Sequence, residues 1–129
     1  MSLLLALLLF QVPDEAISRT CKSVKGATIY SNAYYVEEAG DVVGIEIAIF
    51  PYSGHRALLF VYEGTPFSDP IPLTGKRFGT KVSWSSPKGK LYGTITGHEI
   101  LGTVQVGDGS PERVRLRKVS HLWGCRSKG

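Results

Sequence analysis

The sequence YGTITGHEILGTV, residues 92–104, consists of two runs that mirror each other about the Gly97-His98 pair. Apolar and polar residues alternate on both sides, which is the pattern of two half-buried antiparallel strands joined by a tight turn. Gly93 and Gly102 fall among the inward apolar positions, where glycine marks a bend, a bulge or a close approach of two backbones. Repeated inward glycines predict a strongly coiled sheet that closes on itself.

Further strand patterns flank this hairpin on its N-terminal side. The run VVGIEIAIF (residues 42–50) alternates cleanly, and ALLFVYEG (57–64) is apolar on both faces, which predicts a central strand covered on both sides. AYYVEE (33–38) and RFGTKVSW (77–84) each predict one strand. TPFSDPIPLTGK (65–76) contains three prolines, so we expect the longest irregular segment there.

The composition agrees with a small globular domain that is rich in turns. The chain has 129 residues, of which 43% are hydrophobic and 20% charged, and 15 are glycine. No apolar stripe with a period of 3.6 residues extends beyond two helical turns. We therefore predict one all-β domain, an antiparallel up-and-down meander closed as a small barrel, with a β-sandwich as the alternative.

The first residues, MSLLLALLLFQVPDEAIS, have the features of a secretory signal. Their apolar run is far shorter than the roughly 20 residues that span a bilayer, and Ala16 and Ser18 place small side chains before a possible cut at Arg19. We expect residues 1–18 to be a signal peptide and 19–129 the mature domain; a buried N-terminal strand or short helix is the alternative. Such a cut leaves 15 basic and 9 acidic residues, a net charge of +6.

The two cysteines lie at opposite ends of the expected mature domain. Cys21 is near its start and Cys125 near its end. In an exported protein, an even pair placed in this way predicts one disulfide that joins the first segment to the last. The pair lacks the spacing of zinc ligands.

A basic strand follows the last predicted turn. In RVRLRKV (residues 113–119), Val114 and Leu116 point inward, and the outward positions are Arg113, Arg115 and Arg117. We expect Arg77 and Lys81 to point outward on an earlier strand and Tyr92 on an intervening one. Together these side chains predict a surface for phosphate, an acidic polysaccharide, a membrane surface or an acidic protein. The alternative is a solvated edge strand that its charges protect from aggregation.

Few other residues suggest chemistry. Glu46 is a lone carboxylate on an otherwise apolar strand, so it either faces solvent at an edge or serves as a polar group in a pocket, paired with an arginine. The histidines fall at predicted turns without a second ligand nearby, and we expect neither a metal nor another cofactor; they are His55, His98 and His121. A hydrolase site would have to combine distant residues such as Ser53, His98 and Asp69.

The phrase GTITGHEILGTV is similar to a two-strand phrase of small exported bacterial proteins, often lipocalin-like β-barrels of unknown function. This resemblance implies a fold and no activity. We expect an exported, periplasmic or secreted, non-catalytic binding protein, monomeric or weakly dimeric, with a ligand in the barrel interior or an anionic partner on the basic surface. Nucleic acid is not expected, because one outward aromatic provides little stacking.

Two alternatives to a binding protein remain. YSGHR (residues 52–56) contains a Ser-Gly pair similar to that in loops of bacterial lysozyme inhibitors, which suggests an enzyme inhibitor that acts through a hairpin loop. The other alternative is a small hydrolase whose catalytic residues converge only in the folded chain.

Overall fold

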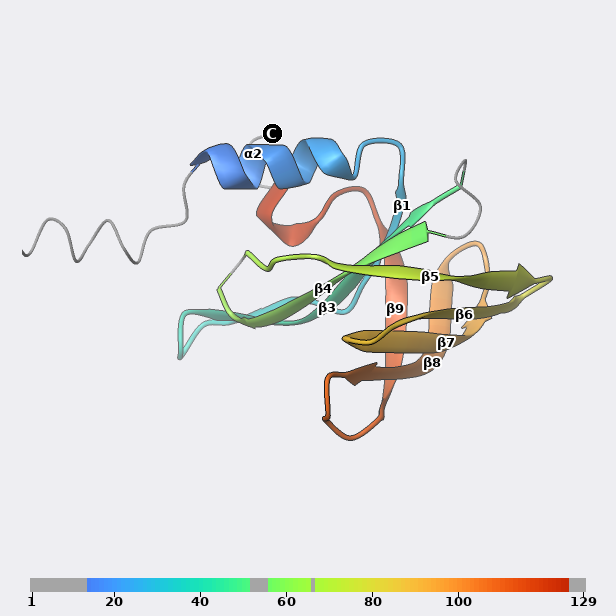
Figure 1. Ribbon diagram of the computed structural model, residues 1–129. Helices are drawn as coiled ribbons and strands as arrows, with labels where there is room; N and C mark the ends of the chain where they lie inside the picture. The colour runs from blue at the N-terminus through green and yellow to red at the C-terminus, as the bar shows by residue number, and fades with distance from the viewer. Residues whose placement is uncertain (1–13, 52–55, 66, 126–129) are drawn as a thin grey trace, which may run out of the picture.

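The computed structural model describes residues 14–51, 56–65 and 67–125, which form a β-barrel with a helix packed across one side (Figure 1). The helical elements are α2 (Asp14–Ser23) and the short 3₁₀ helix η1 (Trp123–Cys125). The strands are β1 (Thr28–Ser31), β2 (Tyr34–Val36), β3 (Asp41–Phe50), β4 (Arg56–Gly64), β5 (Ile71–Phe78), β6 (Lys81–Ser86), β7 (Gly89–Ile95), β8 (Glu99–Val106) and β9 (Glu112–Val119). No helix in these ranges has the length and apolar character needed to cross a bilayer.

The strands confirm the predicted meander and its closure. From β2 to β9 each strand pairs antiparallel with the next one in the sequence. Strand β1 then lies between β9 and β3, pairing Ile29 with Val119 on one side and with Ala48 on the other. This closes eight strands into a barrel, while β2 continues along β3 beyond it.

The barrel interior is occupied by apolar side chains. Thirteen buried residues form its core, among them Trp84, Leu91, Ile100 and Leu116. The mirrored glycines of the β7–β8 hairpin lie directly opposite each other, and a Cβ atom on Gly93 would lie 2.2 Å from a backbone oxygen of β8. Only glycine allows the two backbones to approach this closely, as the sequence predicts.

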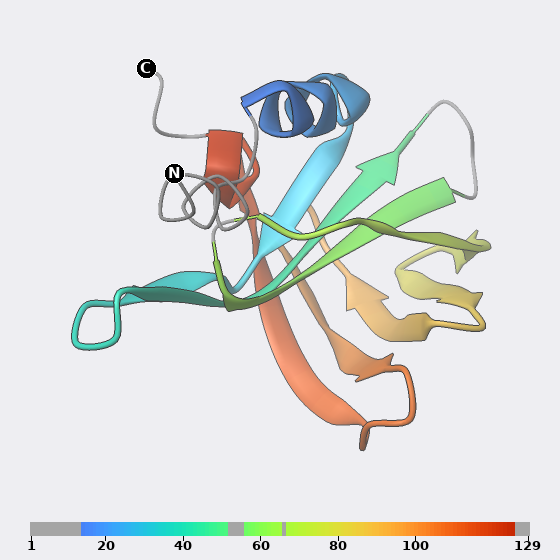
Figure 2. The same cartoon turned by 60° about the vertical axis from the view of Figure 1, so that its left-hand side comes forward.

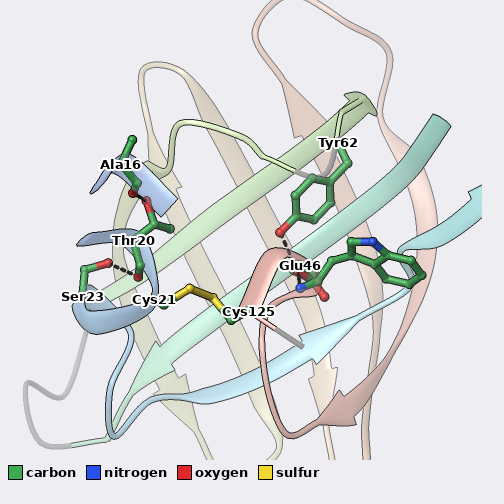
Figure 3. The surroundings of a disulfide bond; sticks show 8 residues. Ala16, Thr20, Cys21, Ser23, Glu46, Tyr62 and Cys125 are labelled. Carbon is green, nitrogen blue, oxygen red and sulfur yellow. Dashed lines mark hydrogen bonds between the residues drawn. A yellow bond between two sulfur atoms is a disulfide. The ribbon is translucent and has the colours of Figure 1, made fainter. Parts of the chain in front are cut away.

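A second apolar core lies outside the barrel wall. Helix α2 and η1 cover the outward face of β1, β3 and β4, where Val24, Phe60 and Leu122 are buried together (Figure 2). Cys21 in α2 and Cys125 in η1 form the predicted disulfide, with a Cα–Cα distance of 5.9 Å (Figure 3). Because both faces of β4 are covered, the prediction of a doubly covered strand is confirmed.

Two local predictions differ from the structure. RFGTKVSW is not one strand: β5 ends at Phe78 and β6 begins at Lys81, with a turn at Gly79-Thr80 that the uninterrupted alternation conceals. The proline-rich segment contains the first six residues of β5, where Pro72 is tolerated opposite Leu58. Helix α2 begins at Asp14, so the expected signal cut between residues 18 and 19 falls inside it; a short N-terminal helix was the alternative to that signal.

Strands β1 and β2 pair with β3 in the same register, although the strand structure is interrupted at Asn32 between them. The Asn32 side-chain oxygen accepts a hydrogen bond from the Ile45 backbone N–H (2.7 Å). The Asn32 backbone N–H donates to the Ile45 carbonyl (3.0 Å). Gly44 lies beside this break with φ of +114°, where a Cβ would lie 2.8 Å from Ala33 Cα. Beyond it, residues 34–43 form a hairpin, which we call the flap, that extends past the barrel (Figures 1 and 2).

Candidate functional site

The three predicted arginines project from the outside of the barrel on β9. Val114 packs against the interior and Leu116 is fully buried there, so Arg113, Arg115 and Arg117 point to solvent, as the alternation predicts. Strand register then determines their neighbours on β8: Arg113 lies opposite Thr103, Arg115 opposite Leu101 and Arg117 opposite Glu99.

Tyr92 on β7 and Lys81 on β6 lie on the same outer surface, two and three strands away from β9. Tyr92 pairs with Thr103 on β8, and Lys81 pairs with Thr94 on β7, which pairs with Leu101. We call the outward side of β6 to β9 the basic face. Its exposed basic residues are Lys81, Lys90, Arg113, Arg115 and Arg117.

A shallow hollow of about 720 Å³ lies on this face between β7, β8 and β9. Arg113 and Arg115 line it, together with the outward side chains of Thr94, Leu101 and Thr103. The hollow therefore combines two guanidinium groups, two hydroxyl groups and one apolar side chain. Guanidinium groups bind carboxylate, sulfate or phosphate groups through paired hydrogen bonds, and hydroxyl groups donate to the same oxygens.

One carboxylate, that of Glu99, partly neutralises the positive charge of the basic face. Glu99 Oε2 lies 3.1 Å from Arg115 Nε, with 27% of the Glu99 side chain and 58% of the Arg115 side chain exposed. An exposed pair of this kind contributes little to stability. The pair uses the Nε–H of Arg115, and the guanidinium group has four further N–H donors.

Glu46 does not belong to this site. It is completely buried in the second core, on the outward face of β3. Its Oε1 accepts hydrogen bonds from the Tyr62 hydroxyl (2.6 Å) and the Trp123 backbone N–H (2.7 Å), as Figure 3 shows for Tyr62. The prediction of a solvent-facing position is wrong, because the C-terminal segment covers this part of β3, and the side chain points away from the barrel interior.

The predicted outward orientation of Arg77 is also wrong. It pairs with Val82 and shares the inward orientation of Leu73, so it lies at the open end of the barrel, where its Nε donates to the Gly79 carbonyl (2.9 Å). Tyr30 is buried close to this end. Burial raises the pKa of the Tyr30 hydroxyl, and the positive charge of Arg77 acts in the opposite direction.

The sequence reasoning missed three residues around the basic face. Leu101 lines the hollow, and Lys76 and Phe78 continue the same outer surface onto β5. Leu101 could have been recognised, since it alternates with Ile100 and Gly102. Lys76 and Phe78 could not, because the segment that contains them was interpreted as a loop and a different strand.

The residues considered for catalysis do not form a described site. Ser53 and His55 lie outside the described residues, and with them most of the YSGHR loop considered for inhibition. His98 and His121 are exposed. Within residues 14–51, 56–65 and 67–125, no three His, Cys, Asp or Glu side chains come together in a way that could hold a metal.

Comparison with protein-family models, with curated proteins and with solved structures gives no match for this chain. The assignment of a function therefore depends on the geometry and charge of the surfaces described above.

Proposed function

We propose that this chain is an exported, non-catalytic binding protein that holds an anionic partner on its basic face. The observation that carries the proposal is the hollow of about 720 Å³ between β7 and β9, lined by Arg113 and Arg115. Lys81 and Tyr92 lie beside it, within one strand of the lining residues Thr94 and Thr103. Cations grouped in this way raise the local concentration of an anion and attract it from a distance.

The packing of the barrel favours an outer site over an interior one. Lipocalin-like barrels that carry a small ligand need a cavity among the inward side chains. Here the inward positions hold large buried residues, including Trp84, Tyr30 and Leu59. Of the two hypotheses from the sequence, the packing therefore favours an anionic partner on the outer surface over a ligand in the barrel interior.

The disulfide supports the export part of the proposal. Disulfides persist in oxidising compartments such as the periplasm or the extracellular space, and this one joins Cys21 to Cys125. If residues 1–18 are a cleaved signal, the intact mass of material recovered from the periplasm or medium lacks their contribution. A mass that retains the leucine-rich start, together with loss of folding when it is deleted, would show instead that this segment is structural.

The binding site is tested by replacing Arg113, Arg115 and Arg117 together with serine. We expect the wild type to bind a sulfated polysaccharide and vesicles that contain an anionic lipid less tightly as salt rises, since exposed charges are screened over about 8–10 Å. The triple variant should bind both probes much more weakly at low salt. Its thermal stability should change little, because surface substitutions usually cost within about 0.5 kcal/mol each.

A matched control removes the same charge elsewhere. Lys22, Lys25 and Arg56 are exposed on the side of the molecule that carries α2, away from the basic face. Their triple serine variant has the same net charge as the arginine variant and should keep most of the binding. Equal loss in both variants would show only a dependence on net charge, and salt-insensitive retention by all three proteins would refute an anionic partner.

A further inference from the structure

Three large apolar side chains are exposed next to the lysines of the basic face and of β5. Phe78 is 75% exposed, Leu101 47% and Tyr92 44%. Phe78 is the last residue of β5, immediately before the Gly79-Thr80 turn, so it lies at the tip of the β5–β6 hairpin. Exposed together on one outer surface, Phe78, Leu101 and Tyr92 suggest contact with an apolar phase or partner.

Cations surround these side chains. Phe78 lies opposite Lys81 on β6, and Lys76, two residues earlier on the same side of β5, lies opposite Ser83. Residues 70–98, which include all of β5, β6 and β7, contain five Lys or Arg and no Asp or Glu. Strands β5 to β7 thus combine the exposed side chains of Phe78 and Tyr92 with basic residues alone, and the carboxylate of Glu99 lies on the neighbouring β8.

Three acidic residues lie at the other end of the molecule. Glu37 and Glu38 form the exposed tip of the flap, with Asp41 at the start of β3. Figures 1 and 2 both show the flap and the β5–β6 tip at opposite ends of the barrel. An asymmetric charge distribution of this kind orients a protein in the field of a charged surface.

We propose that the anionic partner is a lipid bilayer, and that Phe78 enters the headgroup region at the tip of β5–β6 while the lysines contact anionic headgroups. This inference rests on the proposed function and names its partner. Peripheral proteins bind membranes through apolar side chains that enter the interface and cations that attract anionic lipid. An acidic polysaccharide would account for the cations and would leave Phe78 without a role.

The test compares Phe78→Ser with the wild type on vesicles of phosphatidylcholine, the same vesicles with added phosphatidylglycerol, and a sulfated polysaccharide. We expect wild-type binding to the anionic vesicles. The variant should lose about tenfold or more in vesicle affinity, because a buried phenylalanine contributes a transfer free energy of that order, and its polysaccharide binding should be unchanged. Tyr35→Ser is the control, since Tyr35 is 51% exposed on the flap and should stay in water.

A second measurement locates the side chain directly. In Phe78→Trp, bromine-labelled anionic lipid should quench the new fluorescence, while Trp84, which is 3% exposed in the barrel interior, should not respond. Equal vesicle affinity of wild type and Phe78→Ser, or an unquenched Trp at position 78, would overturn the membrane inference. Binding of the polysaccharide without binding of vesicles would also overturn it and would leave the proposed function standing. Binding of neither probe would refute both.

Discussion

The buried carboxylate of Glu46 gives the sharpest prediction about stability. Its Oε1 accepts one hydrogen bond from the Tyr62 hydroxyl and one from the Trp123 backbone N–H, at 2.6 and 2.7 Å. In Glu46→Leu both donors lose this acceptor while the site remains filled. Each buried donor that loses its partner costs about 1–3 kcal/mol, and removing a buried carboxylate returns part of that free energy. We expect a net loss of about 3 kcal/mol.

Glu46→Gln and Tyr62→Phe separate the contributions. Glutamine keeps an oxygen acceptor and replaces hydrogen bonds to a charged group with neutral ones, which are roughly half as strong. We expect a loss of about 1–2 kcal/mol for Glu46→Gln, and about 1.5–3 kcal/mol for Tyr62→Phe, which removes one hydrogen bond to a charged group.

Urea unfolding of the oxidised protein, followed by circular dichroism, measures these differences. Hydrogen exchange at the Trp123 amide reports on the local anchor, while the nearby disulfide joins Cys125 to Cys21 of α2 in every variant. We expect faster exchange at Trp123 in Glu46→Leu, beyond the change in global stability. If Glu46→Leu is as stable as the wild type and the Trp123 amide stays protected, the carboxylate does not anchor the C-terminal segment.

Further predictions concern the disulfide, one glycine and one tyrosine. Cys21 and Cys125 are 104 residues apart. Replacing both with serine should lower the free energy of unfolding, measured by urea denaturation, by up to about 4.7 kcal/mol, as a loop of about 100 residues allows. Gly75→Ala should strongly destabilise the barrel in thermal melts, since its Cβ would lie 1.8 Å from a backbone oxygen of β6, while Gly97→Ala, with nothing within 4 Å, should not. Burial raises the pKa of Tyr30, so the protonated hydroxyl should contribute fully to folding stability below about pH 10, and this contribution should disappear as the pH rises through the folded-state pKa. Alkaline unfolding that is unchanged in Tyr30→Phe would contradict this.

The sequence predicts those features that depend on neighbouring residues. The outward arginines of β9 follow from Val114 and Leu116 between them, and the close β7–β8 approach follows from Gly93 and Gly102. Both depend on a period of two residues that any strand with one buried face shows. Barrel closure follows more weakly, because repeated inward glycines indicate coiling without specifying which strands meet.

Other features depend on segments that are distant in the sequence. Glu46 is buried because Trp123 and its neighbours return to cover β3, which no local pattern around position 46 reveals. The turn at Gly79-Thr80 is hidden because the residues on both sides continue the same alternation, and Phe78 is exposed where a buried residue would be expected. This error concealed Phe78, which continues the outer surface of the basic face onto β5.

The position of β1 has a consequence for the order in which the barrel is assembled. Among the described strands, β1 comes first in the sequence and lies between β3 and the last, β9, so its pairing is completed only when β9 is present. During synthesis, β2 to β8 can pair in succession with their neighbours, while the edges of β1 and β8 remain open. Open edges favour pairing with other chains, and contacts between distant segments form slowly. Until β9 has been synthesised and has paired with β1 and β8, this chain is therefore most prone to aggregation.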